Sequence, residues 1–205
     1  MTSPSIANPL AHAQFLTSAA RLAQLPADER PEAAFAGRSN AGKSSAMNAL
    51  CGVKQLARVS KTPGRTQLIN LFGLPCGARL VDLPGYGYAE VPETLRRSWN
   101  ALVGGYLESR VNLRGLILVM DIRHPLTALD RQMLDWNRAY ARPVHVLLSK
   151  ADKLGRGAAR AAASAVKREL SRLDPAIGVQ VFSALTREGV DEARAVVARW
   201  LDLRA

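Results

Sequence analysis

Short apolar segments alternate with longer amphipathic segments along most of the chain. The segments GLILVMDI and PVHVLLS are apolar at nearly every position, which is typical of parallel strands that are covered on both faces. The segment TALDRQMLDWNRAYA instead repeats Leu129, Met133, Trp136 and Tyr140 at helical spacing. This alternation predicts strands at 33–37, 66–74, 78–83, 115–122, 143–149 and 178–183, and helices at 42–50, 92–110, 127–141, 158–173 and 191–203.

Strands that alternate with helices predict an α/β protein of three layers, in which helices cover both faces of a mostly parallel sheet. Only PCG (75–77) separates the second predicted strand from the third. Because so short a link cannot hold a crossover helix, these two strands should form an antiparallel hairpin. We therefore expect a six-stranded, mostly parallel sheet with one antiparallel hairpin strand. The early segment FLTSAARLAQLP fits either a helix or an edge strand.

The charge balance of the chain is basic, which points to a polyanionic partner. Among its 205 residues, 28 Lys and Arg side chains oppose 17 Asp and Glu, a net charge of +11. The excess is spread along the chain, which indicates a folded basic surface; charge that serves only solubility is the alternative. The longest apolar run, GLILVM, is too short to span a membrane. Cys51 and Cys76 lack disulfide or metal spacing, and with no visible signal peptide we expect a cytoplasmic protein. We also expect it to be monomeric.

A phosphate-binding loop follows the first predicted strand. Residues 37–44 read GRSNAGKS and fit the pattern G-x-x-x-x-G-K-[ST] between a strand and a helix, as that motif requires. Gly37 and Gly42 permit a tight turn whose backbone N–H groups face a polyphosphate, and the helix N-terminus adds a favourable dipole. Lys43 is long enough to reach the β- and γ-phosphates, and the Ser44 hydroxyl can bind Mg²⁺.

Two acidic side chains at later strand ends narrow the choice of nucleotide. Asp82 closes the third predicted strand in DLPG, where its carboxylate can hold Mg²⁺ through water and Gly85 can offer an N–H group to a γ-phosphate. In SKAD (149–152), Asp152 can accept hydrogen bonds from N1–H and the 2-amino group of guanine. Adenine lacks that donor pair, so the pattern favours guanine. The stem of Lys150 can lie over the purine.

Two further segments complete the predicted site. The last predicted strand ends in FSAL, where backbone N–H groups near Ser183 and Ala184 could meet guanine O6. The polar segment ARVSKTPGRTQL (57–68) should supply a threonine that closes over Mg²⁺ and the γ-phosphate. Thr62 and Thr66 are both candidates, and Thr66 borders the second strand as such a threonine would.

Together, GRSNAGKSS, SKTPGRTQLIN, DLPGYGYAEV and SKAD resemble the EngB (YihA/YsxC) ribosome-biogenesis GTPases of the TrmE–Era group, from about residue 15 to the C-terminus. The resemblance implies a Ras-like G domain of the P-loop NTPase class over residues 31–205, with residues 1–30 packed on it as an N-terminal extension. It also implies a cytoplasmic, GTP-hydrolysing switch in large ribosomal subunit assembly, with links to the cell cycle and septation. The expected partners are GTP or GDP and a large-subunit precursor, both rRNA and ribosomal protein, and no membrane.

The resemblance also assigns site residues. Ser44 and Thr66 would bind Mg²⁺, Asp82 would hold it through water, and Lys43, Thr66 and Gly85 would carry catalysis. Asn40 would either help to hold a potassium ion or stabilise the loop. The implied nucleotide site comprises Gly37, Arg38, Ser39, Asn40, Ala41, Gly42, Lys43, Ser44, Ser45, Gly64, Arg65, Thr66, Gln67, Leu68, Asp82, Leu83, Pro84, Gly85, Ser149, Lys150, Ala151, Asp152, Phe182, Ser183 and Ala184.

The chain departs from Ras-like GTPases directly after the DLPG glycine. Many of those enzymes orient the attacking water with a glutamine at this position, which is Tyr86 here. A tyrosine cannot hold water in the same way, so we expect slow intrinsic turnover and acceleration by a monovalent cation or by a group of the ribosomal particle. Tyr86 and Tyr88 are expected to report the nucleotide state by stacking on RNA or packing on protein. The alternative is that they pack against the second helix of their own domain.

Two other function classes fit parts of the sequence. A septin-like module would self-assemble under nucleotide control, with incidental hydrolysis, and the net charge disfavours it mildly. An ATP-dependent P-loop kinase would need a lid and an acceptor site, but no second Arg-rich lid is visible and Asp152 disfavours adenine.

Overall fold

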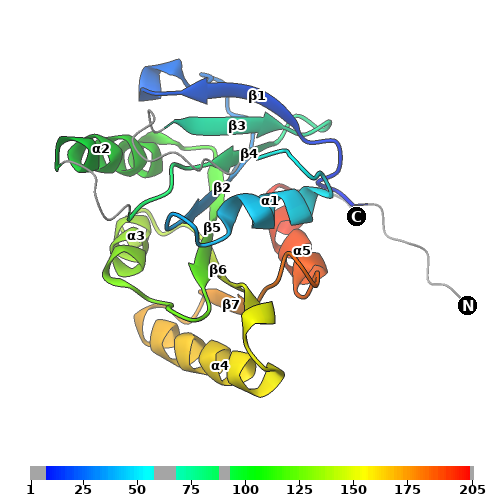
Figure 1. The fold of residues 1–205 in the computed structure, drawn as a ribbon. Helices are drawn as coiled ribbons and strands as arrows, with labels where there is room; N and C mark the ends of the chain where they lie inside the picture. Colours follow the sequence, from blue (N-terminus) through cyan, green and yellow to red (C-terminus); the bar gives the residue numbers. More distant parts are fainter. Residues whose placement is uncertain (1–7, 58–67, 88–92, 204–205) are drawn as a thin grey trace, which may run out of the picture.

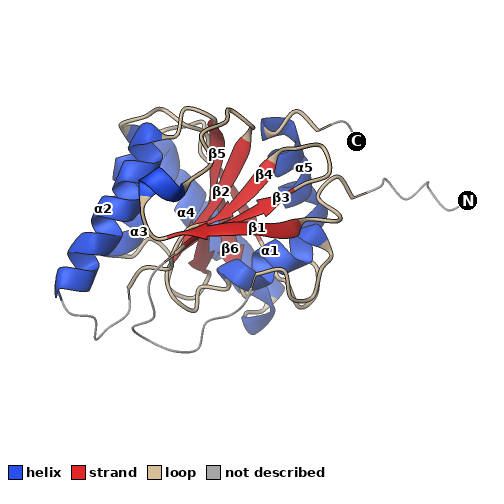
Figure 2. Cartoon of the chain, turned by 90° about the horizontal axis from the view of Figure 1, so that it is seen from above, coloured by secondary structure: helices blue, strands red, loops and turns tan. Residues whose placement is uncertain are grey.

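A seven-stranded sheet lies between two layers of helices in the computed structural model, which describes residues 8–57, 68–87 and 93–203 (Figures 1 and 2). The strands are β1 (Gln14–Ala19), β2 (Glu32–Gly37), β3 (Ile69–Gly73), β4 (Arg79–Asp82), β5 (Leu113–Asp121), β6 (Val144–Ser149) and β7 (Gly178–Val181). The helices are α1 (Lys43–Cys51), α2 (Glu93–Ser109), α3 (Ala128–Arg138), α4 (Arg156–Leu173) and α5 (Val190–Trp200), with short 3-10 turns η1 (Leu22–Gln24) and η2 (Ala151–Lys153). Every predicted strand and helix is present, with ends shifted by at most three residues.

The seventh strand corrects the prediction of six. β1 pairs antiparallel with β3 at one edge of the sheet, whose order is β1-β3-β4-β2-β5-β6-β7. The first part of the stretch that fitted either a helix or an edge strand is therefore an edge strand, and its second part contains the 3-10 turn η1. The signal of the strand in the sequence is weak because an edge strand buries little, and Phe15 and Leu16 remain 59% and 51% exposed. The predicted hairpin of β3 and β4 is confirmed, whereas β2 pairs in parallel with both β4 and β5.

The apolar core has one half on each face of the sheet. Helices α2, α3 and α4 cover one face, with Tyr106, Met133 and Leu170 among the buried side chains. Helices α1 and α5 cover the other face. Because β2, β5 and β6 are covered from both sides, they read as nearly continuous apolar runs. Among the described residues, no helix combines the length and apolarity needed to cross a membrane.

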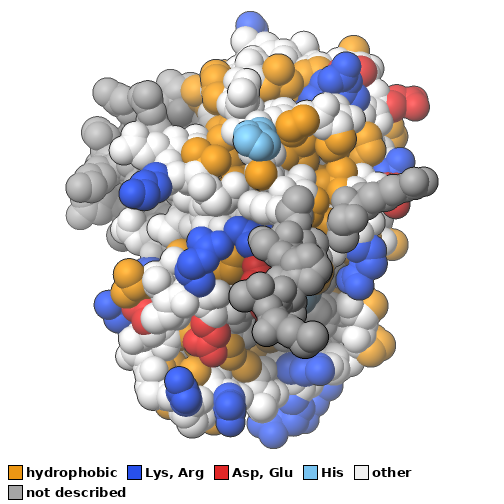
Figure 3. Space-filling model, turned by 90° about the vertical axis from the view of Figure 1, so that its right-hand side faces the viewer, with side chains coloured by type: hydrophobic (Ala, Val, Ile, Leu, Met, Phe, Trp, Pro, Cys, Tyr) orange, Lys and Arg blue, Asp and Glu red, His pale blue; other side chains and the backbone are white. Residues whose placement is uncertain are grey.

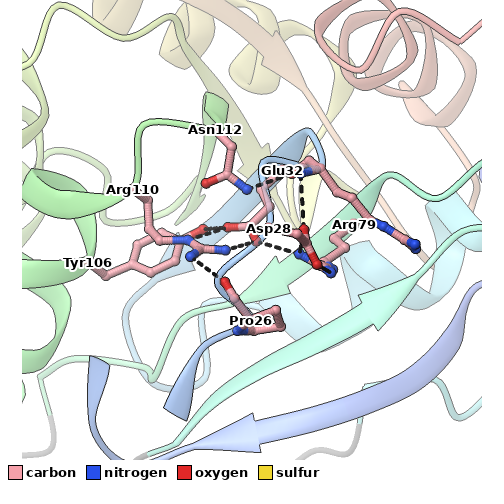
Figure 4. Close-up of polar contacts among 8 residues, drawn as sticks. Pro26, Asp28, Glu32, Arg79, Tyr106, Arg110 and Asn112 are labelled. Carbon is pink, nitrogen blue, oxygen red and sulfur yellow. Dashed lines mark hydrogen bonds and ion pairs between the residues drawn. The ribbon is translucent and has the colours of Figure 1, made fainter. Parts of the chain in front are cut away.

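A buried ionic network joins the amino-terminal ends of β2 and β4 to the end of α2 (Figure 4). The fully buried Glu32 accepts hydrogen bonds from the Tyr106 hydroxyl at 2.9 Å and from Nε of Arg110 at 3.1 Å. Arg79 Nη1 lies 3.5 Å from Glu32 and donates to Asp28 at 2.8 Å. The bond from Arg79 lowers the pKa of Asp28 to about 2. A buried carboxylate left unpaired would cost several kcal/mol, and the two arginines offset that cost.

Two glycines should respond to alanine in opposite directions. At Gly115, a Cβ would come within 2.5 Å of the Trp200 indole, whereas at Gly104 no described atom outside its own helix backbone lies within 4 Å. We expect Gly115→Ala to lower the free energy of unfolding by about 1–3 kcal/mol through overpacking. Gly104→Ala should raise it by about 0.5–1 kcal/mol, because alanine loses less backbone entropy in a helix. Urea unfolding measures both values, and shifts of the same sign would contradict the prediction.

Candidate nucleotide-binding site

The predicted site segments meet at the carboxyl-terminal edge of the sheet. Strands β4, β2, β5 and β6 are adjacent and parallel, so the loops that follow them leave from the same edge. The register pairs Asp121 at the end of β5 with Ser149 at the end of β6, and Asp82 ends β4 beside β2. In open α/β sheets this edge is where ligands bind.

The loop between β2 and α1 has the geometry of an anion-binding turn. A Cβ at Gly37 would lie 2.6 Å from the carbonyl oxygen of Val119, so only glycine fits there. Asn40 and Gly42 have positive φ angles of 64° and 96°, and Gly42 caps the start of α1. Left-handed residues at these points turn backbone N–H groups inward, and the N-terminus of α1 adds its dipole. The predicted phosphate loop therefore has the expected shape.

Lys43 and Asp82 form an ion pair beside this loop. Their side chains are only 11% and 9% exposed. The half-buried hydroxyl of Ser44 follows Lys43 in the first turn of α1. A cation for phosphate oxygens, together with a carboxylate and a hydroxyl for a hard divalent ion, fits a complex of Mg²⁺ with a polyphosphate. No group of three or more His, Cys, Asp or Glu side chains that could hold a metal occurs in the described part of the chain.

The SKAD segment is tied to the phosphate loop. The Ser149 hydroxyl donates to the carbonyl oxygen of Ala41. Lys150 Nζ donates to the carbonyl oxygen of Asn40 at 2.5 Å and lies 3.0 Å from the Asp121 carboxylate. The segments assigned to the phosphates and to the base are thus one connected structure.

Asp152 lies next in this segment, where 3-10 turn η2 follows β6. Its carboxylate accepts a hydrogen bond from the Ser183 hydroxyl at 2.7 Å, and Lys153 Nζ lies 3.4 Å away. The Ser183 bond, assisted by Lys153, lowers the pKa of Asp152 and keeps the group ionised. The N–H of Ala151 donates to Phe182 at 3.1 Å, which holds η2 against the end of β7. An ionised acceptor fixed in this way suits the recognition of paired base donors.

The two backbone amides expected to meet guanine O6 differ in their hydrogen bonds. The N–H of Ser183 donates to the carbonyl oxygen of Glu188 at 2.9 Å, so the loop itself uses this group. The N–H of Ala184 has no acceptor among the described residues. Of these two amides, Ala184 is the one that fits a contact to guanine O6.

Sequence reasoning missed the neighbouring pair of Asp121 and Arg123. The Arg123 guanidinium donates to Asp121 at 2.9 and 2.7 Å, and these bonds, assisted by Lys150, hold the pKa of Asp121 well below its usual range. A signal was available, because Asp121 ends the apolar run of β5 and parallel pairing places it beside the end of β6. Asp121 thereby positions Lys150 on the phosphate loop.

The side chain of Tyr86 is buried, which contradicts the expectation that it contacts a partner. It is 3% exposed, its ring centroid lies 5.5 Å from that of Trp99, and its hydroxyl donates to Asp130 at 2.7 Å. Burial, assisted by the Asp130 charge, raises the pKa of Tyr86 well above its usual value. For Tyr86, the alternative of packing against the domain's own second helix, α2, is confirmed. Tyr88 lies outside the described residues.

The backbone around Tyr86 is seated on the phosphate loop. The Tyr86 carbonyl oxygen accepts a hydrogen bond from the N–H of Ser39 at 2.7 Å. Trp99 Nε1 donates to the carbonyl oxygen of Pro84 at 2.9 Å. Gly85 lies against Ser39, whose hydroxyl is buried and has no hydrogen-bond partner in the described residues. The segment predicted to sense the γ-phosphate therefore lies directly beside the phosphate loop.

The remaining predicted residues differ in exposure. Buried residues are Leu83, Pro84, Ala151 and Phe182, of which Leu83, Ala151 and Phe182 belong to the apolar core. Arg38 and Leu68 are partly exposed, and Ser45 is exposed. Gly64, Arg65, Thr66 and Gln67, together with the alternative Thr62, lie outside the described residues, so their roles stay predictions.

Comparisons with known sequences give a consistent result. A family model described as "50S ribosome-binding GTPase" matches residues 32–150. The chain is 58% identical over 192 residues to "Probable GTP-binding protein EngB" of Aromatoleum aromaticum, which covers 94% of this chain and 89% of the relative. It is 51% identical over 188 residues to the protein of the same name from Coxiella burnetii, which covers 92% of both.

Solved structures agree on the fold. A crystal structure described as a probable GTP-binding protein engB matches with a TM-score of 0.67 at 22% identity, covering 84% of this chain and 100% of the other. Aquifex aeolicus Era bound to GDP.AlF4⁻ matches with a TM-score of 0.64 at 22% identity, covering 83% of this chain and 56% of the other. The three-layer P-loop fold expected from the sequence is thus confirmed, apart from its number of strands.

The Tyr86 hydroxyl offers a test of the contact with α3. Tyr86→Phe keeps the ring against Trp99 but removes a donor to the buried Asp130, so we expect the free energy of unfolding to fall by about 1–3 kcal/mol. Tyr140→Phe is the matched control, since Tyr140 is 38% exposed and its ring stays beside Arg142. Urea unfolding measures both, and equal stability of the two variants would contradict the prediction.

Proposed function

Because the chain belongs to the EngB family of GTP-binding proteins and is a GTPase, we propose that it is a slowly hydrolysing switch that acts in the cytoplasm in assembly of the large ribosomal subunit. The observation that carries the proposal is that GRSNAGKS, DLPG and SKAD meet at one edge of the sheet, in a chain that matches the 50S ribosome-binding GTPase model. The net charge of +11 supports a partner rich in phosphate.

We assign the phosphates to the loop between β2 and α1. Lys43, now paired with Asp82, would move to the β- and γ-phosphates. Ser44, with Thr66 assigned from the sequence alone, would hold Mg²⁺ directly, and Asp82 would hold it through water. When bound, the ion offsets charge on the phosphates. Gly85 would donate its N–H to the γ-phosphate, and its position against Ser39 supports this role.

We assign the base to the SKAD segment. Asp152 would accept hydrogen bonds from N1–H and the 2-amino group of guanine, and the stem of Lys150 would cover the purine. The lowered pKa of Asp152 supports the assignment, because an ionised carboxylate is the stronger acceptor. The N–H of Ala184 would meet guanine O6.

Slow turnover follows from where Tyr86 points. Its hydroxyl is bonded to Asp130, so no side chain at this position orients the attacking water. Acceleration would come from the ribosomal particle or from a potassium ion beside Asn40. The exposed Asn40 has a φ of 64°, a conformation that asparagine tolerates, so shaping the loop is its alternative role.

Asp152→Asn should change the preferred base. An amide cannot accept from both guanine donors, so GTP affinity should fall by about 100-fold or more, while xanthosine triphosphate, whose base has an oxygen in place of the 2-amino group, should bind better than to the wild type. Fluorescence titration of both nucleotides measures this shift. Asp135→Asn, an exposed acid on α3, is the control and should leave both affinities unchanged. An unchanged preference of Asp152→Asn for GTP would contradict the assignment of Asp152 to guanine recognition.

The switch function should appear in GTP hydrolysis. Purified large subunits should stimulate hydrolysis by about tenfold or more over the free protein, because the missing water-orienting group would come from the particle. Rates are compared in potassium and in sodium buffers, with small subunits as the control. No increase in either salt would argue against the switch. Nucleotide-dependent sedimentation of the protein as a self-assembly, without subunit binding, would favour the septin-like alternative.

A further inference from the structure

Helix α4 carries a more uneven charge than any other helix in the described chain. Its 18 residues hold five cationic side chains against one carboxylate, Glu169. By contrast, α2, α3 and α5 each hold two cationic and two acidic side chains, and α1 holds only Lys43, which belongs to the phosphate loop. Among the helices, the basic excess is therefore concentrated in one element.

The five cations of α4 all lie on its solvent side. Its buried positions, Ala159, Val166 and Leu170, form a separate face, which packs in the core. At 100° per residue, Arg156, Arg160 and Lys167 fall within about 40° of one another and make a row roughly 17 Å long. A second row on the same exposed side consists of Arg168 and Arg172. We call this surface, formed by the five cations, the α4 basic face.

The single acid of the helix does not neutralise the first row of this face. Glu169 lies 2.5 Å from Arg131 of α3, on the side of α4 that faces away from the row of Arg156, Arg160 and Lys167. The row of Arg156, Arg160 and Lys167 is thus uniformly positive along its length.

The residues between the cations decide which polyanion fits. They are small, namely Gly157, Ala161, Ser164, Ala165 and Ser171, and all are exposed, so a phosphate backbone can approach closely. The one large apolar side chain exposed on α4 is Leu173, at its end. An interfacial membrane helix would instead present a wide apolar face, so the composition favours nucleic acid over an anionic lipid surface.

The position of α4 makes this face accessible. The helix packs beside β7 at the edge of the sheet opposite β1, where it forms one end of the molecule (Figure 1). In the space-filling view, Lys and Arg side chains gather along the lower border, toward the end where α4 lies in Figure 1 (Figure 3). The helix also begins four residues after Asp152, next to the base end of the candidate site.

We propose that the α4 basic face binds the phosphate backbone of RNA and is the surface through which this chain contacts ribosomal RNA. The inference rests on the proposed function for the identity of the RNA. Contacts of this kind are made to phosphates without reading sequence, so each one lost should lower the salt dependence of binding by roughly 0.7 to 0.9 in the slope of log K against log salt.

The test compares two triple substitutions that remove the same charge. The α4 triple variant removes the three charges of the first row through Arg156→Gln, Arg160→Gln and Lys167→Gln. The control triple variant removes three exposed arginines elsewhere through Arg114→Gln, Arg138→Gln and Arg199→Gln. Glutamine matches arginine and lysine in helix propensity, and the one strand position, Arg114 in β5, is exposed, so both proteins should fold. Each protein, bound to a non-hydrolysable GTP analogue, is titrated at increasing KCl against purified large subunits and against the same subunits' deproteinised RNA.

The α4 triple variant should bind both probes about tenfold or more weakly at low salt, with a slope smaller by roughly 2 to 3, while GTP affinity stays unchanged. The control triple variant should retain most of the affinity and slope. Equal losses in the two variants would overturn the proposal. So would a loss on intact subunits without a loss on bare RNA, which would indicate a ribosomal protein. A loss confined to vesicles containing phosphatidylserine would overturn it in favour of lipid.

The same titrations separate this inference from the proposed function. If the α4 triple variant binds large subunits as tightly as the wild-type protein does, only the α4 inference is overturned. Wild-type protein that binds the bare RNA through α4, but not large subunits, would overturn only the ribosomal role. Wild-type protein that binds neither probe would overturn both.

Discussion

Parallel pairing of β2 with both of its neighbours is the constraint on which the rest of the molecule depends. Because β4, β2, β5 and β6 run in one direction, their carboxyl ends must share one edge, and the loops that follow them meet there. The opposite edge is closed by charge, because Arg79 and Arg110 each pair with Glu32 where β2 and β4 begin and α2 ends. One edge of the sheet is thus fixed by ion pairs satisfied within the protein. The carboxyl-terminal edge instead carries the charged side chains of Lys43, Asp121 and Asp152, which lie at or beside the loops of the candidate site.

The elements that the sequence predicted well are those with a strong local signal. Continuous apolar runs predicted β5 and β6, and the short link PCG predicted the β3–β4 hairpin. The motif GRSNAGKS predicted the phosphate loop. The misses depend on distant partners. The edge strand β1, with its exposed Phe15, was not predicted with certainty, because it pairs with β3, which lies more than fifty residues away in the sequence. The fate of Tyr86 depends on Trp99 and Asp130, which two different helices supply. The N–H of Ser183, by contrast, is engaged for a local reason, because its own loop closes onto Glu188.

From the sequence alone, Tyr86 is only the residue that replaces a water-orienting glutamine. In the structure, its side chain and its main chain each make a contact of their own. Its side chain bridges α2 and α3, while its main chain pairs with Ser39 of the phosphate loop. Any movement of this segment away from the loop must therefore either break a buried hydrogen bond to Asp130 or carry α3 with it. The residue that replaces a water-orienting glutamine thus links the candidate site to the helical layer on one face of the sheet. The α4 basic face belongs to that same layer, on the far side of α3.

The ion pair of Lys43 and Asp82 has a consequence for what the loop will accept. Each partner satisfies the other, and both are nearly buried, so separating them exposes two charges at once. An anion arriving alone would satisfy Lys43 and strand the carboxylate of Asp82; a metal ion arriving alone would strand the ammonium group. Only a ligand that brings both signs of charge can exchange partners with the pair in one step. The protein's own salt bridge therefore works as a filter that discriminates against bare phosphate and bare cation alike, before any contact with a base is made.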